Sequence, residues 1–199
     1  MFVAQAFCDD QDAGYLENSS LTYSENQPLL EVKGGYFVFT DAKMRKIYNQ
    51  GGFDIQVSGS YPVWSCLEVY GSIGYLKCSG KSLNDHQKTS IWEIPVSLGI
   101  KPVFRISSKL HYYFAIGPRY FYIHQHNDSA YVKRNQGRNG LGMFVNTGFN
   151  YVLCNNLFFD VFMEYSYEKM RLHSSKNRDY TRNIQVGRVS FEGGMGYVF

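Results

Sequence analysis

The sequence predicts an all-β protein, an eight-stranded antiparallel up-and-down β-barrel that crosses a membrane. Three observations lead to this prediction. Tyr, Phe and Gly are abundant, with 17, 15 and 19 copies among 199 residues, and they favour twisted sheets and membrane interfaces over helices. Apolar and polar residues alternate with the period of two that marks a strand. Long and short connections also alternate, which is typical of membrane barrels.

The alternation is clearest in the last segment, where one parity is apolar at Val189, Phe191, Met195, Tyr197 and Phe199. Eight such segments are predicted to be strands, at residues 30–40, 52–61, 65–76, 90–102, 110–122, 140–151, 157–167 and 188–199. The first is the least regular. The long connections are 41–51, 77–88, 124–139 and 168–184, and the short ones are 62–64, 105–109 and 155–156.

Alternation alone does not say which face points outward, because a soluble lipocalin-like barrel buries its apolar set. The polar parity here is rich in Gly, Ser and charges of both signs, which suits the narrow interior of an eight-stranded barrel. We therefore expect the apolar parity to face lipid. The candidates for ion pairs in the lumen are Lys33, Arg119 and Arg188 with Asp160, Glu164 and Glu192. Inward parity is also expected for the rings of Phe37, Phe39, Tyr70, Phe144, Phe158 and Phe162.

Composition argues against several other classes of protein. The net charge of +3 is small and the basic residues gather between strands, so nucleic-acid binding is not expected. No run reaches the roughly 18 to 20 apolar residues of a membrane-spanning helix. The four cysteines have no metal-finger spacing, and neither a metal nor a cofactor is predicted.

The amino terminus precedes the predicted barrel. Residues 1–6 (MFVAQA) are similar to the end of a signal peptide with its A-x-A cleavage site, and an ordinary amino terminus is the alternative. We assign residues 1–29 to this remnant plus a polar periplasmic extension, and residues 30–199 to the barrel.

The carboxyl-terminal segment GGMGYVF resembles the closing strand of bacterial outer-membrane proteins. In those proteins a terminal Phe with apolar residues at alternate positions is read by the barrel-assembly machinery, a role that here falls to Phe199, Tyr197 and Met195. Over residues 30–199 the chain resembles small barrels of the OmpA, OmpX and OmpW kind. The resemblance implies an integral protein of the bacterial outer membrane.

Three groups of residues are candidates for reactive sites, but no catalytic residue is assigned. His173 and Ser175 faintly resemble the His-x-Ser of lipid A deacylases, but a solvated loop explains them better. His124 and His126 are only two metal ligands, so a strand end that runs into a turn is the preferred interpretation. Asp160 and Glu164 would share the lumen face, where ion pairing is favoured over acid–base catalysis.

Basic residues in the long connections are candidate contacts to the phosphates of lipopolysaccharide, because Arg and Lys bind such groups. They are Lys43, Arg45, Lys46, Arg171, Lys176 and Arg178. The alternative is that these charges only solvate the loops. Cys8, Cys66 and Cys154 are expected near the periplasmic side and Cys78 at an outer loop, so disulfide links to envelope partners are one option, beside free thiols or an internal bridge.

Taken together, these features predict a non-enzymatic outer-membrane barrel with a structural or surface-interaction role and no wide pore. An OmpW-like conduit or binder for small hydrophobic molecules is the first alternative, and a lipid A-modifying hydrolase is the second.

Overall fold

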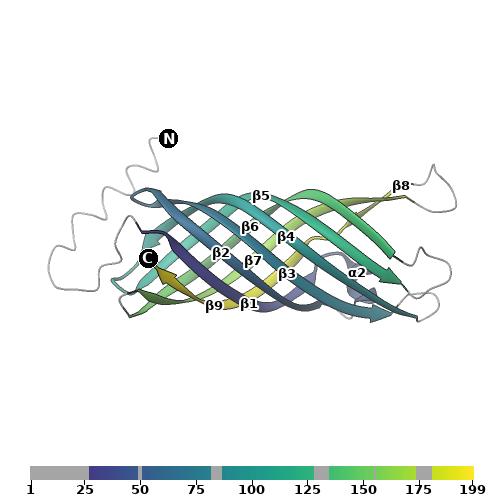
Figure 1. Ribbon diagram of the computed structural model, residues 1–199, viewed down its shortest axis with the longest axis horizontal. Coiled ribbons are helices and arrows are strands. Elements are labelled where there is room, and N and C mark those ends of the chain that lie inside the picture. Colours follow the sequence, from purple (N-terminus) through teal and green to yellow (C-terminus); the bar gives the residue numbers. More distant parts are fainter. Residues whose placement is uncertain (1–26, 49–50, 82–86, 128–134, 155, 174–180) are drawn as a thin grey trace.

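The computed structural model describes residues 27–48, 51–81, 87–127, 135–154, 156–173 and 181–199. These residues form one closed barrel with a short helix at one end (Figure 1). The elements are β1 (Leu29–Phe39), α2 (Ala42–Ile47), β2 (Gly51–Trp64), β3 (Leu67–Lys81), β4 (Lys88–Arg105), β5 (Leu110–Asn127), β6 (Asn135–Cys154), β7 (Leu157–His173), β8 (Thr181–Gln185) and β9 (Arg188–Val198). No helix among them is long and apolar enough to cross a membrane.

Antiparallel pairing runs from β1 through β7, and β9 pairs with both β7 and β1, which closes the sheet. β8 pairs with the far end of β7. Between β8 and β9, Val186 N donates a hydrogen bond to Glu168 O and Thr40 N donates one to Gly187 O. We treat β8 and β9 as two parts of one wall strand, so the barrel has the predicted eight.

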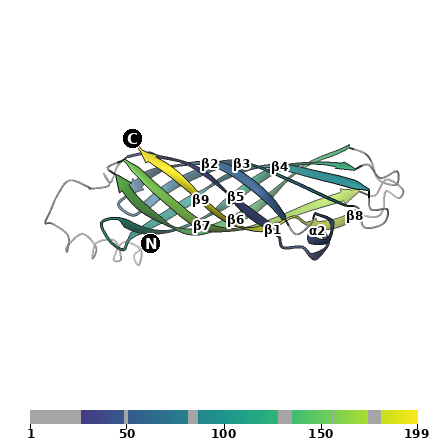
Figure 2. The ribbon, with the colours of Figure 1, turned by 90° about the horizontal axis from the view of Figure 1, so that it is seen from below.

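The two ends of the barrel differ. The start of β1 and the finish of β9 lie at one end, where Leu29 pairs with Val198, together with the short turns (Figures 1 and 2). α2 and the longer connections lie at the other. Membrane barrels have short turns on the periplasmic side and long loops outside, so we name these the periplasmic end and the outer end.

Large apolar side chains cover the outside of the wall. Phe53 is 76% exposed and Leu141 is 73% exposed, which in water would be costly. Aromatic residues border this belt, for example Phe53 at its outer margin and Tyr61 at its periplasmic margin. The path between those two along β2 is about 27 Å, or about 20 Å along the axis of a barrel with strands tilted by about 40°. That height suits the apolar band of an outer-membrane barrel.

The predicted strands are present, but several continue farther toward the outer end. β5 runs to Asn127 instead of ending at Tyr122, and β6 begins at Asn135 instead of Gly140. His124 and His126 therefore lie at a strand end, in agreement with the preferred interpretation of this pair, whereas the connection predicted to begin at residue 124 begins after Asn127. Alternating polarity marks only the part of a strand that crosses lipid, whereas backbone pairing continues into water.

Substitution in the middle of the belt tests its contact with lipid. Val57 is 40% exposed and pairs with Val32 and Ile73. We expect Val57→Arg to lower the free energy of unfolding by about 2–4 kcal/mol, because the guanidinium would enter the apolar band. Val57→Ile should change it by less than about 0.5 kcal/mol. Urea unfolding in phospholipid vesicles measures both, and equal stability of the two variants would contradict a lipid-facing belt.

Candidate functional site: the charged lumen and the closed outer end

The periplasmic half of the lumen holds a buried charged cluster around Lys33. Its Nζ lies 2.7 Å from Glu31 Oε2 and 2.6 Å from Asp160 Oδ2. Lys101 Nζ is 3.8 Å from Glu31 Oε1 and 3.4 Å from Glu68 Oε2. Two cations thus face three carboxylates, and of these five side chains only that of Glu68, at 7%, has any exposed surface. We call these five residues the periplasmic-side cluster.

Neutral groups hold this cluster in place. Ser58 Oγ donates to Glu31 Oε2 at 2.7 Å, and Tyr113 OH lies 3.0 and 2.9 Å from the two oxygens of Asp160. Lys33 Nζ is also 4.4 Å from the ring centroid of Phe162 and Lys101 Nζ is 4.6 Å from that of Tyr113, distances at which a cation is attracted to a ring. Buried charges retain this many partners because isolation would be very costly.

A second group, the outer-side cluster, surrounds Arg119 and Arg188. The guanidinium of Arg119 binds Glu164 through two bonds of 2.6 and 2.7 Å, and its Nε donates to Ser97 Oγ. Arg188 Nη1 is 2.6 Å from Glu93 Oε1. Glu168 lies 4.0 Å from Arg119 and 3.9 Å from Arg188. The two-bond contact has the fork geometry of the strongest side-chain ion pairs.

Of the six residues chosen as lumen ion-pair candidates, five occur in these two clusters. The sixth, Glu192, is buried and accepts a hydrogen bond from Ser190 Oγ at 2.7 Å. Sequence reasoning did not single out Tyr113, or Glu168, which it placed in a connection. The signal for Tyr113 was present, because it has the same parity as Arg119.

The six aromatic residues expected to point inward are all buried, with exposed fractions between 0% and 3%. Tyr70 and Phe144 pack with a centroid separation of 5.7 Å, and the Arg119 guanidinium lies 5.2 Å from the Phe144 ring centroid. Phe37, Tyr70 and Phe144 have no accessible surface at all, so they touch neither bulk water nor a cavity that could hold water. These rings therefore fill the lumen between and beside the charged clusters.

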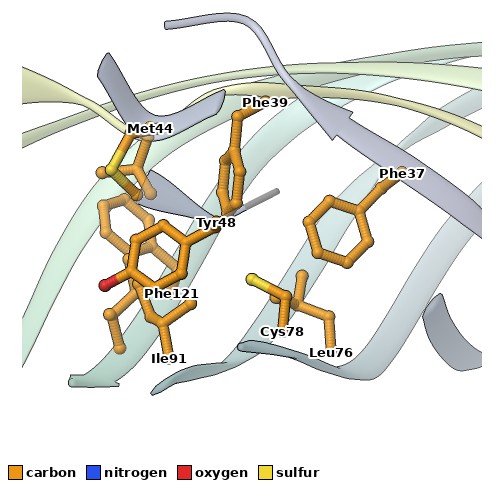
Figure 3. Close-up of a cluster of buried hydrophobic side chains, with 10 residues drawn as sticks. Phe37, Phe39, Met44, Tyr48, Leu76, Cys78, Ile91 and Phe121 are labelled. Atoms are coloured by element: carbon orange, nitrogen blue, oxygen red, sulfur yellow. The ribbon is translucent and has the colours of Figure 1, made fainter. Parts of the chain in front are cut away.

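The outer end of the lumen is filled by a third group, the outer apolar cluster, to which α2 contributes (Figure 3). Asp41 caps the helix by accepting bonds from the backbone N of Lys43 and Met44. Met44, and Tyr48 just after the helix, are buried among wall residues. The wall members are Phe37, Phe39, Leu76, Cys78, Ile91, Phe121, Ile123 and Val186. Connection 41–51, which was expected to be a polar loop, thus partly fills the lumen, because the side chains of Met44 and Tyr48 are buried inside the barrel.

Three of the candidate lipopolysaccharide contacts lie on α2. Lys43, Arg45 and Lys46 are exposed, although Arg45 Nη1 also donates to Phe39 O and Thr40 O at 3.1 Å. The backbone of Arg171 belongs to β7, while its side chain lies outside the described part, as do Lys176 and Arg178. Their contacts to lipid stay predictions.

Of the histidine and serine candidates for reactive sites, some lie within the described residues and some do not. The backbone of His173 belongs to β7, whereas Ser175 lies outside the described residues. His124 stacks on Trp92 at 5.3 Å, and His126 Nδ1 is 2.5 Å from Asn135 Oδ1. No group of three or more His, Cys, Asp or Glu in the described segments is placed to hold a metal ion.

The cysteines occupy different environments. Cys66, in the turn between β2 and β3, is disulfide-bonded, as suits an oxidising compartment. Cys78 is a free thiol buried in the outer apolar cluster.

At the carboxyl terminus, the predicted assembly signal lies on the outside of the wall. Met195, Tyr197 and Phe199 are about half exposed, and Phe199 N donates to Pro28 O. Their recognition by assembly machinery stays a prediction.

A closed wall of eight strands with an apolar outer face and a charged, filled interior defines a transmembrane barrel of the outer-membrane type. Solved structures share this fold. Outer membrane protein OprG from Pseudomonas aeruginosa aligns with a TM-score of 0.62 at 14% identity, over 89% of this chain and 99% of that one. Ail of Yersinia pestis, in complex with the heparin analogue sucrose octasulfate, gives 0.56 at 16% identity, over 88% and 99%.

Neisserial surface protein A gives a TM-score of 0.56 at 14% identity, over 86% of this chain and 97% of that one. No protein-family model and no curated protein sequence matches the chain. At these identities the likeness concerns the fold, and it confirms the predicted fold class. The chain has the fold and the surface of an integral outer-membrane protein.

The pair formed by Arg119 and Glu164 offers a direct test of the lumen. We expect Arg119→Met to lower the free energy of unfolding by about 3–5 kcal/mol, because Glu164 would remain buried without its main partner. Arg119→Met with Glu164→Gln should recover most of that loss. Urea unfolding of the refolded protein in micelles measures both variants. Equal losses in the single and double variants would contradict the pairing.

Substitution of Gly80 tests whether α2 packs against β3. A Cβ on Gly80 would lie 1.8 Å from Ile47 O, whereas one on Gly71 would lie 3.9 Å from Ser97 O, an ordinary van der Waals contact. The extra methyl of Gly80→Ala should destabilise the packed position of α2 by about 1–3 kcal/mol. The α2 connection would then open more often, and trypsin cleaves the open form. We therefore expect cleavage after Lys43 or Lys46 to be at least about fivefold faster. Gly71→Ala is the control. Mass spectrometry identifies the cut, and equal rates would show that α2 does not rest against β3.

Proposed function

We propose that this chain is a non-enzymatic outer-membrane barrel with a structural or surface-interaction role and no wide pore. The filling of the lumen carries this proposal. Lys101, Arg119, Tyr113 and Phe144 all have exposed fractions of 0%, so no water-filled path runs past them. An eight-stranded barrel has room for side chains alone in its interior.

The ion pairs of the lumen act as structural groups in this proposal. Their charges are already matched to partners on other strands, such as Glu93 with Arg188, and Glu164 makes two bonds with Arg119. A general acid or base needs access to a substrate, and these carboxylates are buried. The geometry therefore supports ion pairing in preference to acid–base catalysis.

The surface role is assigned to the outer end, where exposed cations occur. Lys43 and Lys46 on α2 are exposed toward that side, and we propose that they contact anionic glycolipid such as lipopolysaccharide. Ail, which shares the fold, was solved with a sulfated heparin analogue. That likeness lends support to an anionic partner for this chain.

A conduit or binder for small hydrophobic molecules is less well supported. Such a role needs an apolar space, and the inward rings have little or no accessible surface. Several of them also lie over cations, as Phe162 does over Lys33. A hydrophobic molecule would have to displace these contacts.

Current through the reconstituted protein tests the absence of a pore. We expect the wild-type chain in planar bilayers at 1 M KCl to give no sustained current. Tyr70→Ala with Phe144→Ala removes two lumen rings and should produce open-channel events, because water can enter the space. Tyr36→Ala with Phe149→Ala removes two outward rings, which are 43% and 48% exposed, and should remain silent. Steady conductance of the wild-type chain would refute the closed lumen.

A further inference from the structure

The outer end of the barrel wall contains a cationic cleft. It has a volume of about 700 Å³ and lies where α2 meets the outer ends of β3, β4 and β5. We propose that this cleft binds the phosphate groups of glycolipids in the outer leaflet. The inference deepens the lipid contact proposed above and rests on the membrane placement, but it does not depend on the closed lumen.

Three lysines give the cleft its charge. Lys81 and Lys88 are direct partners across β3 and β4, and Lys46 reaches the same space from α2. Like charges directly opposite each other destabilise a sheet. Among the described residues that line the cleft there is no Asp or Glu. A bound dianion would supply a counter-charge to these lysines, and lysine is well suited to phosphate as a compact point charge.

The cleft lies just above the aromatic margin of the belt. Trp92 pairs with Lys77 and packs against Tyr75 and Tyr122, rings that favour the interface between lipid and water. The Lys81–Lys88 pair is four residues farther along the strands, about 13 Å in length and about 10 Å in height at a tilt of about 40°. The headgroup layer is about 5–8 Å thick, so the backbone of the pair lies just beyond it, and the flexible lysine side chains can reach its phosphates.

The orientation of the lining favours a lipid over a soluble ligand. Cross-strand partners face the same side of a sheet, so Ser79, Lys81 and Lys88 share the outward parity of Trp92 and the apolar belt. Ser79, Lys81 and Lys88 are exposed. A glycolipid whose chains lie along the belt would bring its phosphates to this height without leaving the leaflet. Ser79 adds a hydroxyl donor beside the ammonium groups.

The wall of the cleft is fixed by close packing of α2. Gly80 approaches Ile47 so closely that a Cβ at this position would clash with the Ile47 carbonyl oxygen. Met44 and Tyr48 anchor the same segment in the outer apolar cluster (Figure 3). This packing fixes α2 against the inner side of the wall, and Lys46 lines the cleft from there.

Lipid titration of the refolded chain in micelles tests the proposal. The chain has two tryptophans, so Trp64→Phe leaves Trp92, at the aromatic margin four residues from Lys88, as the fluorescent reporter. In that background we expect Lys81→Gln with Lys88→Gln to weaken binding of bisphosphorylated lipid A by about 25-fold, or about fivefold for each lysine. Lys109→Gln removes an exposed lysine at the periplasmic end and should bind as the parent does.

Further arms identify the ligand. Fully dephosphorylated lipid A should bind the parent and the double variant equally, and millimolar inorganic phosphate should not compete with the lipid. A double variant that binds bisphosphorylated lipid A as the parent does would overturn the proposal. Competition by inorganic phosphate would overturn its assignment to lipid. The heat-dependent shift of the band on an SDS gel checks that each variant is folded. If the double variant does not fold, Lys88→Gln alone takes its place. None of these outcomes bears on the conductance test of the closed lumen.

Discussion

The barrel depends on matching four buried cations with carboxylates in a lumen that excludes water. Lys33, Lys101, Arg119 and Arg188 are all 0–2% exposed, and leaving one such charge unpaired would cost about 3–5 kcal/mol, a large share of the net stability of a domain. Closure brings the partners together. Lys33 on β1 meets Asp160 on β7 past the single strand β9, and Arg188 on β9 meets Glu93 on β4, which is not a neighbouring strand.

This matching also fixes the register of the wall. Side chains alternate between lumen and lipid, so a shift of one residue would turn every cation toward the membrane and every belt residue toward the lumen. The cost at Arg119 alone would be a few kcal/mol if it entered the apolar band, besides the loss of its two bonds with Glu164. Buried ion pairs add little net stability over apolar packing, and we infer that their main effect here is to select one register.

Much of this arrangement could be predicted from sequence, because lipid on one side and a narrow lumen on the other impose a strict period of two. That constraint ends at the membrane boundary, and so did the accuracy of the prediction. β5 and β6 continue past the alternating region, and Met44 and Tyr48 occur in a segment of polar composition, so neither the strand extensions nor the burial of these two side chains had a periodic signal. The partner of a cation was hidden where it lies on a strand that is not an immediate neighbour, as for Lys33 on β1 and Asp160 on β7, which β9 separates.

The same constraint explains where the chain can interact with other molecules. Inside the barrel the cations have partners and the rings have no accessible surface, so a ligand there would have to replace existing contacts. Along the belt only lipid chains find complementary surface. At the outer end the situation differs, because the Lys81–Lys88 pair is held together by the β-ladder and Lys46 by the packing of α2, whatever the cost of their repulsion. A fold that holds like charges together in this way leaves them available to an anion, and the position of this cleft beside the leaflet favours one carried by lipid.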